Sequence, residues 1–254
     1  PLIRDKDAAG AALALAEYAS ILKEEQKTLA DALRGLWLRE GYLHNDLVST
    51  VMRGAAGRAR IEKIQQGMRD NPPTEIGGHA VTAFYDRADP KGPWGPIKSG
   101  TDAASRDMLV FQLGPDRRIL LRPSGTEPKN KIYVEVCGRP GAPLETEVPL
   151  VVAEAKDLAI AFAQQMLARV DIHLPAWALR VSDLVAIEHK QHFAEVVIPG
   201  LRSRLSAGEP VQDWLAEQLR PYGKDPLRLV ADAVRAWAAE GSTDAAAVRA
   251  LFGV

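Results

Sequence analysis

Strand-forming patterns are confined to one part of this chain, and this restricts the folds open to it. Residues 108–113 and 118–121 are apolar runs joined by a short Gly-Pro-Asp turn, as in a β-hairpin. Residues 131–136 alternate polar and apolar side chains, as a half-buried strand does. Because further strands are expected at 47–52 and 79–85, the sequence predicts a small antiparallel sheet.

Segments with helical periodicity lie on both sides of these strands. Asp7 precedes an Ala-rich helical pattern, at a position where the helix dipole favours negative charge. Thr28 is the expected N-cap of a second helix that stops near Gly41. Two more helices are expected at 58–68 and 147–170. The sheet should therefore be flanked by helices.

Two regions outside the strands have distinct compositions. Residues 86–105 contain three prolines and three glycines, which predicts a loop. From Asp171 onward only helical periods occur, so the last part of the chain is predicted to be a small all-helical bundle. Its tryptophans favour core anchors over a ligand-binding role; they are Trp177, Trp214 and Trp237.

These patterns predict an α+β fold class with a three-part organisation. Residues 1–40 are expected to be helical, and residues 41–170 to form the sheet with its flanking helices. Residues 171–254 are expected to form the helical extension. No internal repeat or low-complexity segment is visible in the sequence.

Composition excludes several classes of function. The 254 residues carry a formal net charge of −1, so we expect no nucleic-acid partner and no basic membrane-binding surface. No apolar run approaches the roughly 20 residues that a membrane span needs. The single cysteine, Cys137, permits no intrachain disulfide, which favours a reducing compartment and predicts a cytoplasmic protein.

One short segment carries chemistry. Residues 122–129, with the sequence RPSGTEPK, lie between two predicted strands. Arg122 offers a planar fork of donors that matches phosphate oxygens, and hydroxyl donors follow at Ser124 and Thr126. Gly125 lets backbone N–H groups converge on an anion. The residues by themselves predict either a phosphate-binding loop or an ordinary polar surface turn.

The whole string resembles the phosphate-binding loop in the fourth domain of the α-phosphohexomutase family, which includes phosphoglucomutases and phosphomannomutases. The match covers seven consecutive residues, 122–128, and a strand follows them as in the family. A second match, at 4–7 and 26–33, resembles the end of the family's third domain. The resemblance extends over roughly residues 1–168.

The resemblance implies a fold and a set of site residues. Residues 41–170 would form the family's fourth domain, which has a TATA-binding-protein-like sheet, and residues 1–40 would end the third domain. The residues expected to hold the phosphate of a phosphorylated hexose are Arg122, Ser124, Gly125, Thr126, Lys129 and Lys131. Lys131 stands where many members have arginine, a difference that favours phosphoglucomutase-like relatives. Lys6 matches a lysine that reaches the active-site cleft.

The resemblance also implies parts that this sequence does not contain. In the family, a phosphoserine transfers the phosphoryl group and a Mg²⁺ ion supports the transfer. The motifs for the nucleophile, the metal and the sugar-reading loop are all missing here. We therefore expect no catalytic residue and no metal ligand in this chain, which would work only with the amino-terminal domains of the same protein.

Two interpretations follow for function. In the first, the chain is the carboxyl-terminal fragment of an intramolecular phosphotransferase that interconverts glucose 1-phosphate and glucose 6-phosphate, and it is inactive alone. The start at Pro1 favours a fragment. In the second, it is a non-catalytic phosphate-binding or protein-interaction module. The sequence leaves open the choice among glucose, mannose and pentose, and the role of the helical extension.

Overall fold

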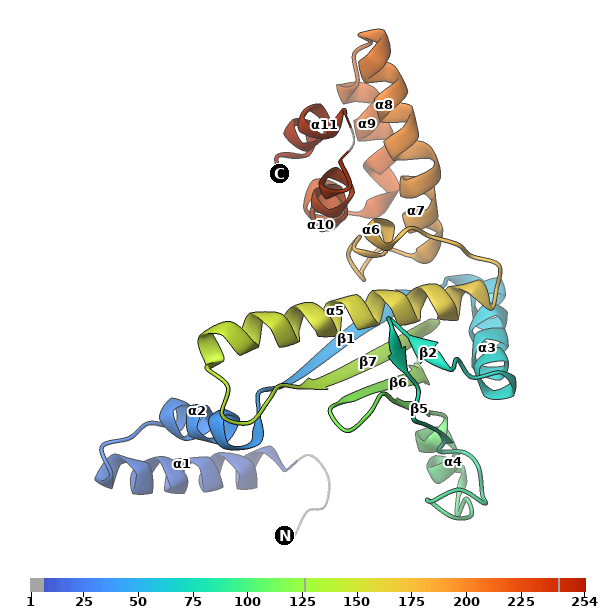
Figure 1. Ribbon diagram of the computed structural model, residues 1–254. Helices are drawn as coiled ribbons and strands as arrows, with labels where there is room; N and C mark the ends of the chain where they lie inside the picture. The colour runs from blue at the N-terminus through green and yellow to red at the C-terminus, as the bar shows by residue number, and fades with distance from the viewer. Residues whose placement is uncertain (1–6, 126, 242) are drawn as a thin grey trace. The chain divides into compact units, whose positions relative to one another are not determined.

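A computed structural model describes residues 7–125, 127–241 and 243–254 (Figure 1). The chain divides into two compact units, which are described separately below. The first contains Pro1–His44 with Val136–Ala153, and the second contains Asn45–Glu135 with Glu154–Val254.

Two capped helices form most of the first unit. Helix α1 (Ala8–Glu24) is capped by Asp7, whose carboxylate accepts from the backbone N–H of Gly10. Helix α2 (Leu29–Glu40) begins with a capping box between Thr28 and Asp31. It ends before Gly41, whose φ of 95° suits glycine. Both helices are confirmed where the sequence predicts them.

Five strands form the main sheet, in the order β1-β7-β6-β5-β4. Neighbours β4, β5 and β6 pair antiparallel, with Phe111 opposite both Phe84 and Ile119. The bounds are Leu43–Val51 for β1, Ala83–Asp86 for β4, Leu109–Gln112 for β5, Arg117–Pro123 for β6 and Lys129–Cys137 for β7. The predicted fold class, an antiparallel sheet flanked by helices and followed by a helical region, is confirmed.

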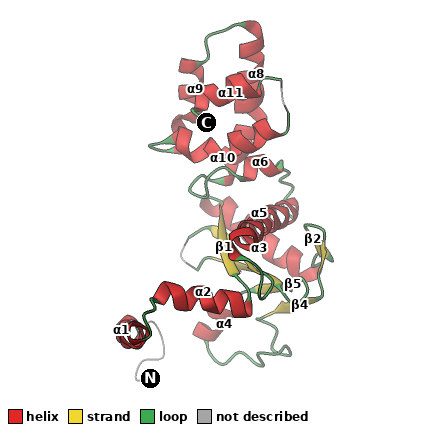
Figure 2. Ribbon diagram, turned by 60° about the vertical axis from the view of Figure 1, so that its left-hand side comes forward, coloured by secondary structure: helices red, strands yellow, loops and turns green. Residues whose placement is uncertain are grey.

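The core of the second unit lies between the sheet and the helices that cover it, α3 (Gly54–Asp70) and α5 (Leu144–Ala168) (Figures 1 and 2). Alternate residues of β7 face this core, since Ile132 and Val134 are fully buried. The ring of Phe111 lies 5.0 Å from that of Phe162 on α5. This packing fixes the position of β6 and therefore the point at which the loop after β6 leaves the sheet.

Two sequence predictions for 79–105 differ from the structure. The single strand expected at 79–85 is divided into β3 (His79–Ala80), which pairs with β2 (Glu75–Ile76), and β4 of the main sheet.

The predicted loop at 86–105 is also only partly correct, because it contains most of helix α4 (Gly100–Arg106). The guanidinium of Arg106 donates to Asp102 at 2.7 Å and to the carbonyls of Trp94 and Gly95 at 3.1 and 2.8 Å. This buried side chain holds the Pro- and Gly-rich segment against the helix, an interaction that local composition does not reveal.

The predicted helical extension consists of short helices (Figure 1). They are α6 (Ala176–Leu179), α7 (Ile187–His192), a π-helix η1 (Phe193–Val197), α8 (Ile198–Ala207), α9 (Gln212–Leu219), a 3₁₀ helix η2 (Arg220–Tyr222), α10 (Pro226–Ala239) and α11 (Ala245–Phe252). Trp177 and Trp237 are buried as core residues. Trp214 is half-buried, with the guanidinium of Arg204 4.4 Å from its ring.

Candidate functional site

The segment between β6 and β7 is a loop whose ends are anchored. The backbone N–H of Ser124 donates to the carbonyl of Lys129 at 2.9 Å, which closes the loop at its base. The backbone N–H of Met52 donates to the carbonyl of Pro128 at 2.9 Å, which ties the loop to the residue after β1. These two hydrogen bonds therefore hold the ends of the loop in defined positions. Thr126 lies outside the described residues.

A cleft of about 520 Å³ lies between this loop and helix α3. Its wall combines residues from the loop, from α3 and from the segment before β5. The lining residues are Arg58, Ile61, Glu62, Gln65, Gln66, Arg69, Asp107, Arg122, Pro123, Ser124, Gly125, Glu127 and Pro128. Three residues that the sequence predicts for phosphate binding, namely Arg122, Ser124 and Gly125, thus share one cavity.

Two arginines of the cleft have no ion-pair partner within the part of the chain that the structure describes. Arg122, at the end of β6, is half-buried, and Arg58 on α3 is exposed. Arg69 is different, because it donates to Asp86 at 2.9 Å and also pairs with Asp107. Burial lowers the pKa of Arg69, but the two carboxylates outweigh it and the net shift is upward. Among the described residues that line the cleft, only Arg58 and Arg122 therefore offer an unpaired positive charge to an anion.

The two lysines predicted for phosphate binding do not line this cleft. The ammonium of Lys129 lies 2.5 Å from a carboxylate oxygen of Glu127, and this hydrogen bond lowers the pKa of the Glu127 carboxyl group. Lys131 lies on β7 and makes a smaller contribution to the same lowering. Lys129 neutralises the one loop carboxylate that faces the cleft. Lys6 lies outside the described residues.

A buried amide pair lies beside the cleft, and one of its members, Gln65, lines it. Gln65 on α3 donates through Nε2 to Oδ1 of Asn130 on β7 at 3.2 Å, and both side chains are buried. The remaining amide atoms, Oε1 of Gln65 and Nδ2 of Asn130, have no partner among the described residues. A buried polar atom without a partner costs about 1–3 kcal/mol. Because Oε1 of Gln65 is itself inaccessible to solvent, it is a cost to the fold and not an acceptor open to a ligand.

Sequence reasoning did not select the residues that α3 contributes. Their spacing could have indicated them, because Arg58, Glu62, Gln65 and Arg69 recur at intervals of three and four on one helix face. This polar face would ordinarily indicate solvent exposure. Only the packing of α3 beside the loop turns it into the second wall of a cleft.

Gly125 has a smaller role than its type suggests. Its φ lies outside the left-handed region, and a Cβ placed on it would meet nothing within 4 Å. The backbone conformation of Gly125 therefore does not demand glycine. Because Gly125 is exposed at the cleft, its missing side chain leaves open space where a ligand can approach the loop backbone.

Among 7–125, 127–241 and 243–254, no group of three or more His, Cys, Asp or Glu side chains is arranged to hold a metal ion. We assign no magnesium ligand to them. In the described part of the chain, no helix is both long and apolar enough to cross a bilayer.

The sequence of the chain is similar to the sequences of several known proteins. No family model matches the chain. It is 37% identical over 138 residues to a phosphoglucomutase of Staphylococcus aureus (strain N315), a match that covers 54% of this chain and 25% of the relative. It is 36% identical over 137 residues to a probable phosphomannomutase of Haemophilus influenzae (strain Rd), with the same two coverages.

The chain thus spans about a quarter of the length of the curated relatives that it matches. Its homologues carry the names phosphoglucomutase and phosphomannomutase, so the resemblance predicted from residues 122–128 is confirmed.

Proposed function

We propose that this chain is the carboxyl-terminal, phosphate-binding part of a phosphosugar mutase. Such an enzyme is an isomerase of carbohydrate metabolism that works as an intramolecular phosphotransferase, and glucose 1-phosphate with glucose 6-phosphate is the first candidate pair. One observation carries the proposal: Arg122 and Ser124 share a cleft in which the guanidinium of Arg122 has no carboxylate partner among the described residues. The names of the homologues support the same class.

In this proposal the cleft holds the phosphate that does not react. The fork of Arg122 donates to two phosphate oxygens, and the hydroxyl of Ser124 donates to a third. Arg58 adds positive charge from the facing helix. Lys129 keeps Glu127 paired, which reduces the repulsion between that carboxylate and the phosphate. Thr126, Lys131 and Lys6 are assigned to the site from the family resemblance alone.

The chemistry of transfer would require groups outside this chain. The resemblance implies a phosphoserine and a Mg²⁺ ion on amino-terminal domains of the same protein, and the ion would stabilise the charge of the transferring phosphoryl group. The first unit offers a surface for such domains, since α1 exposes Leu13 by 72% and Ile21 by 50%. We propose that the chain alone is inactive and that the whole protein is cytoplasmic.

The test is a titration of the 254-residue chain with inorganic phosphate and with glucose 6-phosphate, followed by NMR. Replacing Arg122 with Ala should weaken both ligands by about tenfold or more, because a charge-assisted contact is lost. Arg118→Ala is the matched control, since Arg118 lies on the same strand but pairs with Glu135 outside the cleft. Equal binding by the Arg122→Ala variant and the original chain would refute the assignment of the cleft.

A second candidate function, a non-catalytic phosphate-binding or protein-interaction module, is favoured by one observation. The match to the relatives covers 54% of the chain, so nearly half of the chain lies outside the matched region. A mutase assay on the full product of the gene separates the two. Interconversion of glucose 1-phosphate and glucose 6-phosphate supports the enzyme, and phosphate binding without interconversion supports the module.

A further inference from the structure

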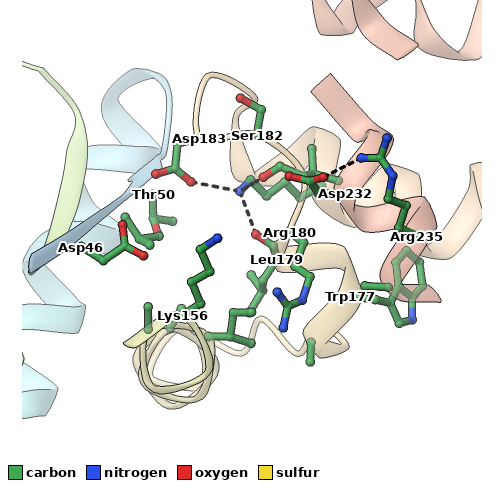
Figure 3. Close-up of a pocket in the computed structure, with 18 of the residues that line it drawn as sticks. Asp46, Thr50, Lys156, Trp177, Leu179, Arg180, Ser182, Asp183, Asp232 and Arg235 are labelled. Carbon is green, nitrogen blue, oxygen red and sulfur yellow. Dashed lines mark hydrogen bonds and ion pairs between the residues drawn. The ribbon is translucent and has the colours of Figure 1, made fainter. Parts of the chain in front are cut away.

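A second and larger cavity lies in the same unit, away from the loop after β6. Its volume is about 760 Å³, and its wall is formed by β1, α5, α6, α7 and α10 with the segment that joins α6 to α7 (Figure 3). A volume of this size is typical of small-molecule sites. The residues that form it are spread along the chain from Asp46 to Glu240. No part of the proposed mutase chemistry uses it.

The charges that face this cavity balance. Four cationic side chains and four carboxylates line it, so their formal sum is zero. Formal balance by itself does not decide the ligand, because the charges that line the cleft at Arg122 also sum to zero. What decides is which charges are uncommitted: a wall with an uncommitted cation and an uncommitted carboxylate can bind a molecule that carries one charge of each sign.

Most of these charges are already paired. The ammonium of the buried Lys190 donates to the carbonyl of Val181 at 2.6 Å and lies 3.7 Å from the carboxylate of Asp183. Asp183 also accepts from the backbone N–H of Ser49. Arg235 pairs with Asp232 at 2.8 Å, and Arg180 pairs with Asp157 at 3.0 Å. These groups stabilise the walls rather than offer a site.

A lysine and an aspartate remain available on the side formed by α5 and β1. Lys156 on α5 has no ion pair or hydrogen bond among the described side chains, and its ammonium points into the cavity (Figure 3). Within the described part of the chain, Asp46 on β1 accepts one hydrogen bond, from the backbone N–H of its neighbour Leu47 at 2.9 Å. In Figure 3, Lys156 lies between Asp46 and the segment at Leu179. Among the described residues, the cavity therefore presents one uncommitted cation, Lys156, and two uncommitted carboxylates, Asp46 and Glu240, of which Asp46 lies on the side of Lys156.

The rest of the wall is apolar. Ile160 on α5 and Ile187 on α7 line it, and Trp177 and Leu179 of α6 contribute larger side chains. Several alanines, including Ala163, keep the space open because their side chains are short. A ligand that fits this wall combines an apolar group with one positive and one negative charge.

We propose that this cavity binds a free α-amino acid with an apolar side chain. The ammonium of Lys156 pairs with the carboxylate of the ligand, Asp46 accepts from the ammonium of the ligand, and the side chain of the ligand packs against Trp177 and Leu179. This site is independent of the proposed mutase function, because it shares no lining residue with the cleft at Arg122.

The proposal is tested on the full 254-residue chain with three probes of nearly equal shape. L-Leucine carries both charges, leucinamide lacks the carboxylate, and 4-methylpentanoate lacks the ammonium. Calorimetry should show binding of L-leucine, with each of the other two at least about tenfold weaker. Equal affinity for the three probes, or no binding of L-leucine, would overturn the proposal. This comparison needs no variant and does not depend on how a substitution folds.

Two substitutions, at the exposed Lys156 and the half-buried Asp46, then assign the charges. Lys156→Met should weaken L-leucine by about tenfold and leave leucinamide unchanged, because only the carboxylate contact is lost. Asp46→Asn should weaken L-leucine and leave 4-methylpentanoate unchanged. Lys224→Met, at an exposed lysine outside the cavity, is the control and should bind L-leucine as before. If Lys156→Met also binds L-leucine as before, the assignment of the cavity is wrong.

Discussion

The two cavities of the second unit are built in different ways. The cleft at Arg122 takes about half of its wall from one continuous loop, and a single helix supplies most of the rest. The cavity at Lys156 takes its wall from five elements. A loop of consecutive residues keeps its chemistry visible in the sequence, whereas a cavity assembled from distant elements does not. The motif at 122–129 therefore marks one of these two cavities, and no motif in the sequence marks the other.

Their electrostatics differ as well. The cleft has two arginines without partners among the described residues, and its loop carboxylate, Glu127, is neutralised by Lys129. The larger cavity has balanced charges, most of which are paired within the fold. Among the described residues of the cleft, the unpaired side chains are Arg58, Arg122 and Glu62, which together leave one positive charge and suit an anion. In the larger cavity they include both signs, which suits a zwitterionic molecule.

The largest expected effect is a loss of stability when the buried ion pair in the wall of the larger cavity, Lys190 with Asp183, is broken. The cleft at Arg122 does not contain this pair. Burial raises the pKa of Asp183 and lowers that of Lys190, so each charge depends on the other. Replacing Lys190 with Met leaves the carboxylate of Asp183 buried without its cation and removes a donor from the carbonyl of Val181. We expect a loss of about 3 kcal/mol in the free energy of unfolding, measured by urea denaturation and tryptophan fluorescence.

Two comparisons sharpen this result. The double variant Lys190→Met with Asp183→Asn should recover part of the stability, because no unpaired charge remains buried. Lys224→Met, at an exposed site, should change the free energy of unfolding by less than about 0.5 kcal/mol. A Lys190→Met variant as stable as the original would mean that the buried pair does not hold this region together.

An intermediate effect tests whether α3 is a true wall of the cleft. Arg58→Ala removes an exposed cation that faces the loop, so phosphate should bind about two- to fivefold more weakly, measured by NMR titration. The effect should be smaller than that of Arg122→Ala because the side chain of Arg58 is more exposed. Lys63→Ala is the control on the same helix, where Lys63 lies 3.7 Å from Asp171 and outside the cleft. Equal losses from both variants would show only a general effect of charge.

The smallest effect concerns the pH dependence of the loop. The hydrogen bond from Lys129 lowers the folded-state pKa of Glu127, so the contribution of this pair is present above the unfolded-state pKa and is lost as the pH falls through the folded value. A carbon-detected NMR titration should therefore place the midpoint of Glu127 below its ordinary value. Lys129→Met should raise that midpoint, and Lys129→Arg should keep it low. A midpoint unaffected by Lys129→Met would contradict the pairing.

The sequence predicted the local elements of the fold well where local signals are strong. The caps at Asp7 and Thr28 and the hairpin between β5 and β6 were found because their residues act on their immediate neighbours. The segment at 86–105 was partly missed. Helix α4 there is held by the buried guanidinium of Arg106, whose partners depend on how the chain folds back.

In the candidate site, too, the residues of one continuous segment were predicted, and the residues brought to it by folding were not. Arg122, Ser124 and Gly125 were selected from the sequence, and the structure brings them to one cleft. Arg58 and Gln65 were not selected, because a polar helix face is ordinarily a solvated one. The roles of Lys129 and Lys131 in phosphate binding stay predictions, since these side chains do not line the cleft.

From the sequence alone came the hairpin of β5 and β6, the capped helices, the RPSGTEPK loop and, through that loop, the likeness to phosphoglucomutases and phosphomannomutases. These are properties of neighbouring residues. Only the tertiary structure decided which charges remain uncommitted. Arg69 and Arg122 are the same residue type in one cleft, yet Arg69 is bound by Asp86 and Asp107 while Arg122 is open to a ligand. Lys156 and Lys190 differ in the same way, because pairing depends on distances across the fold that spacing along the chain does not encode.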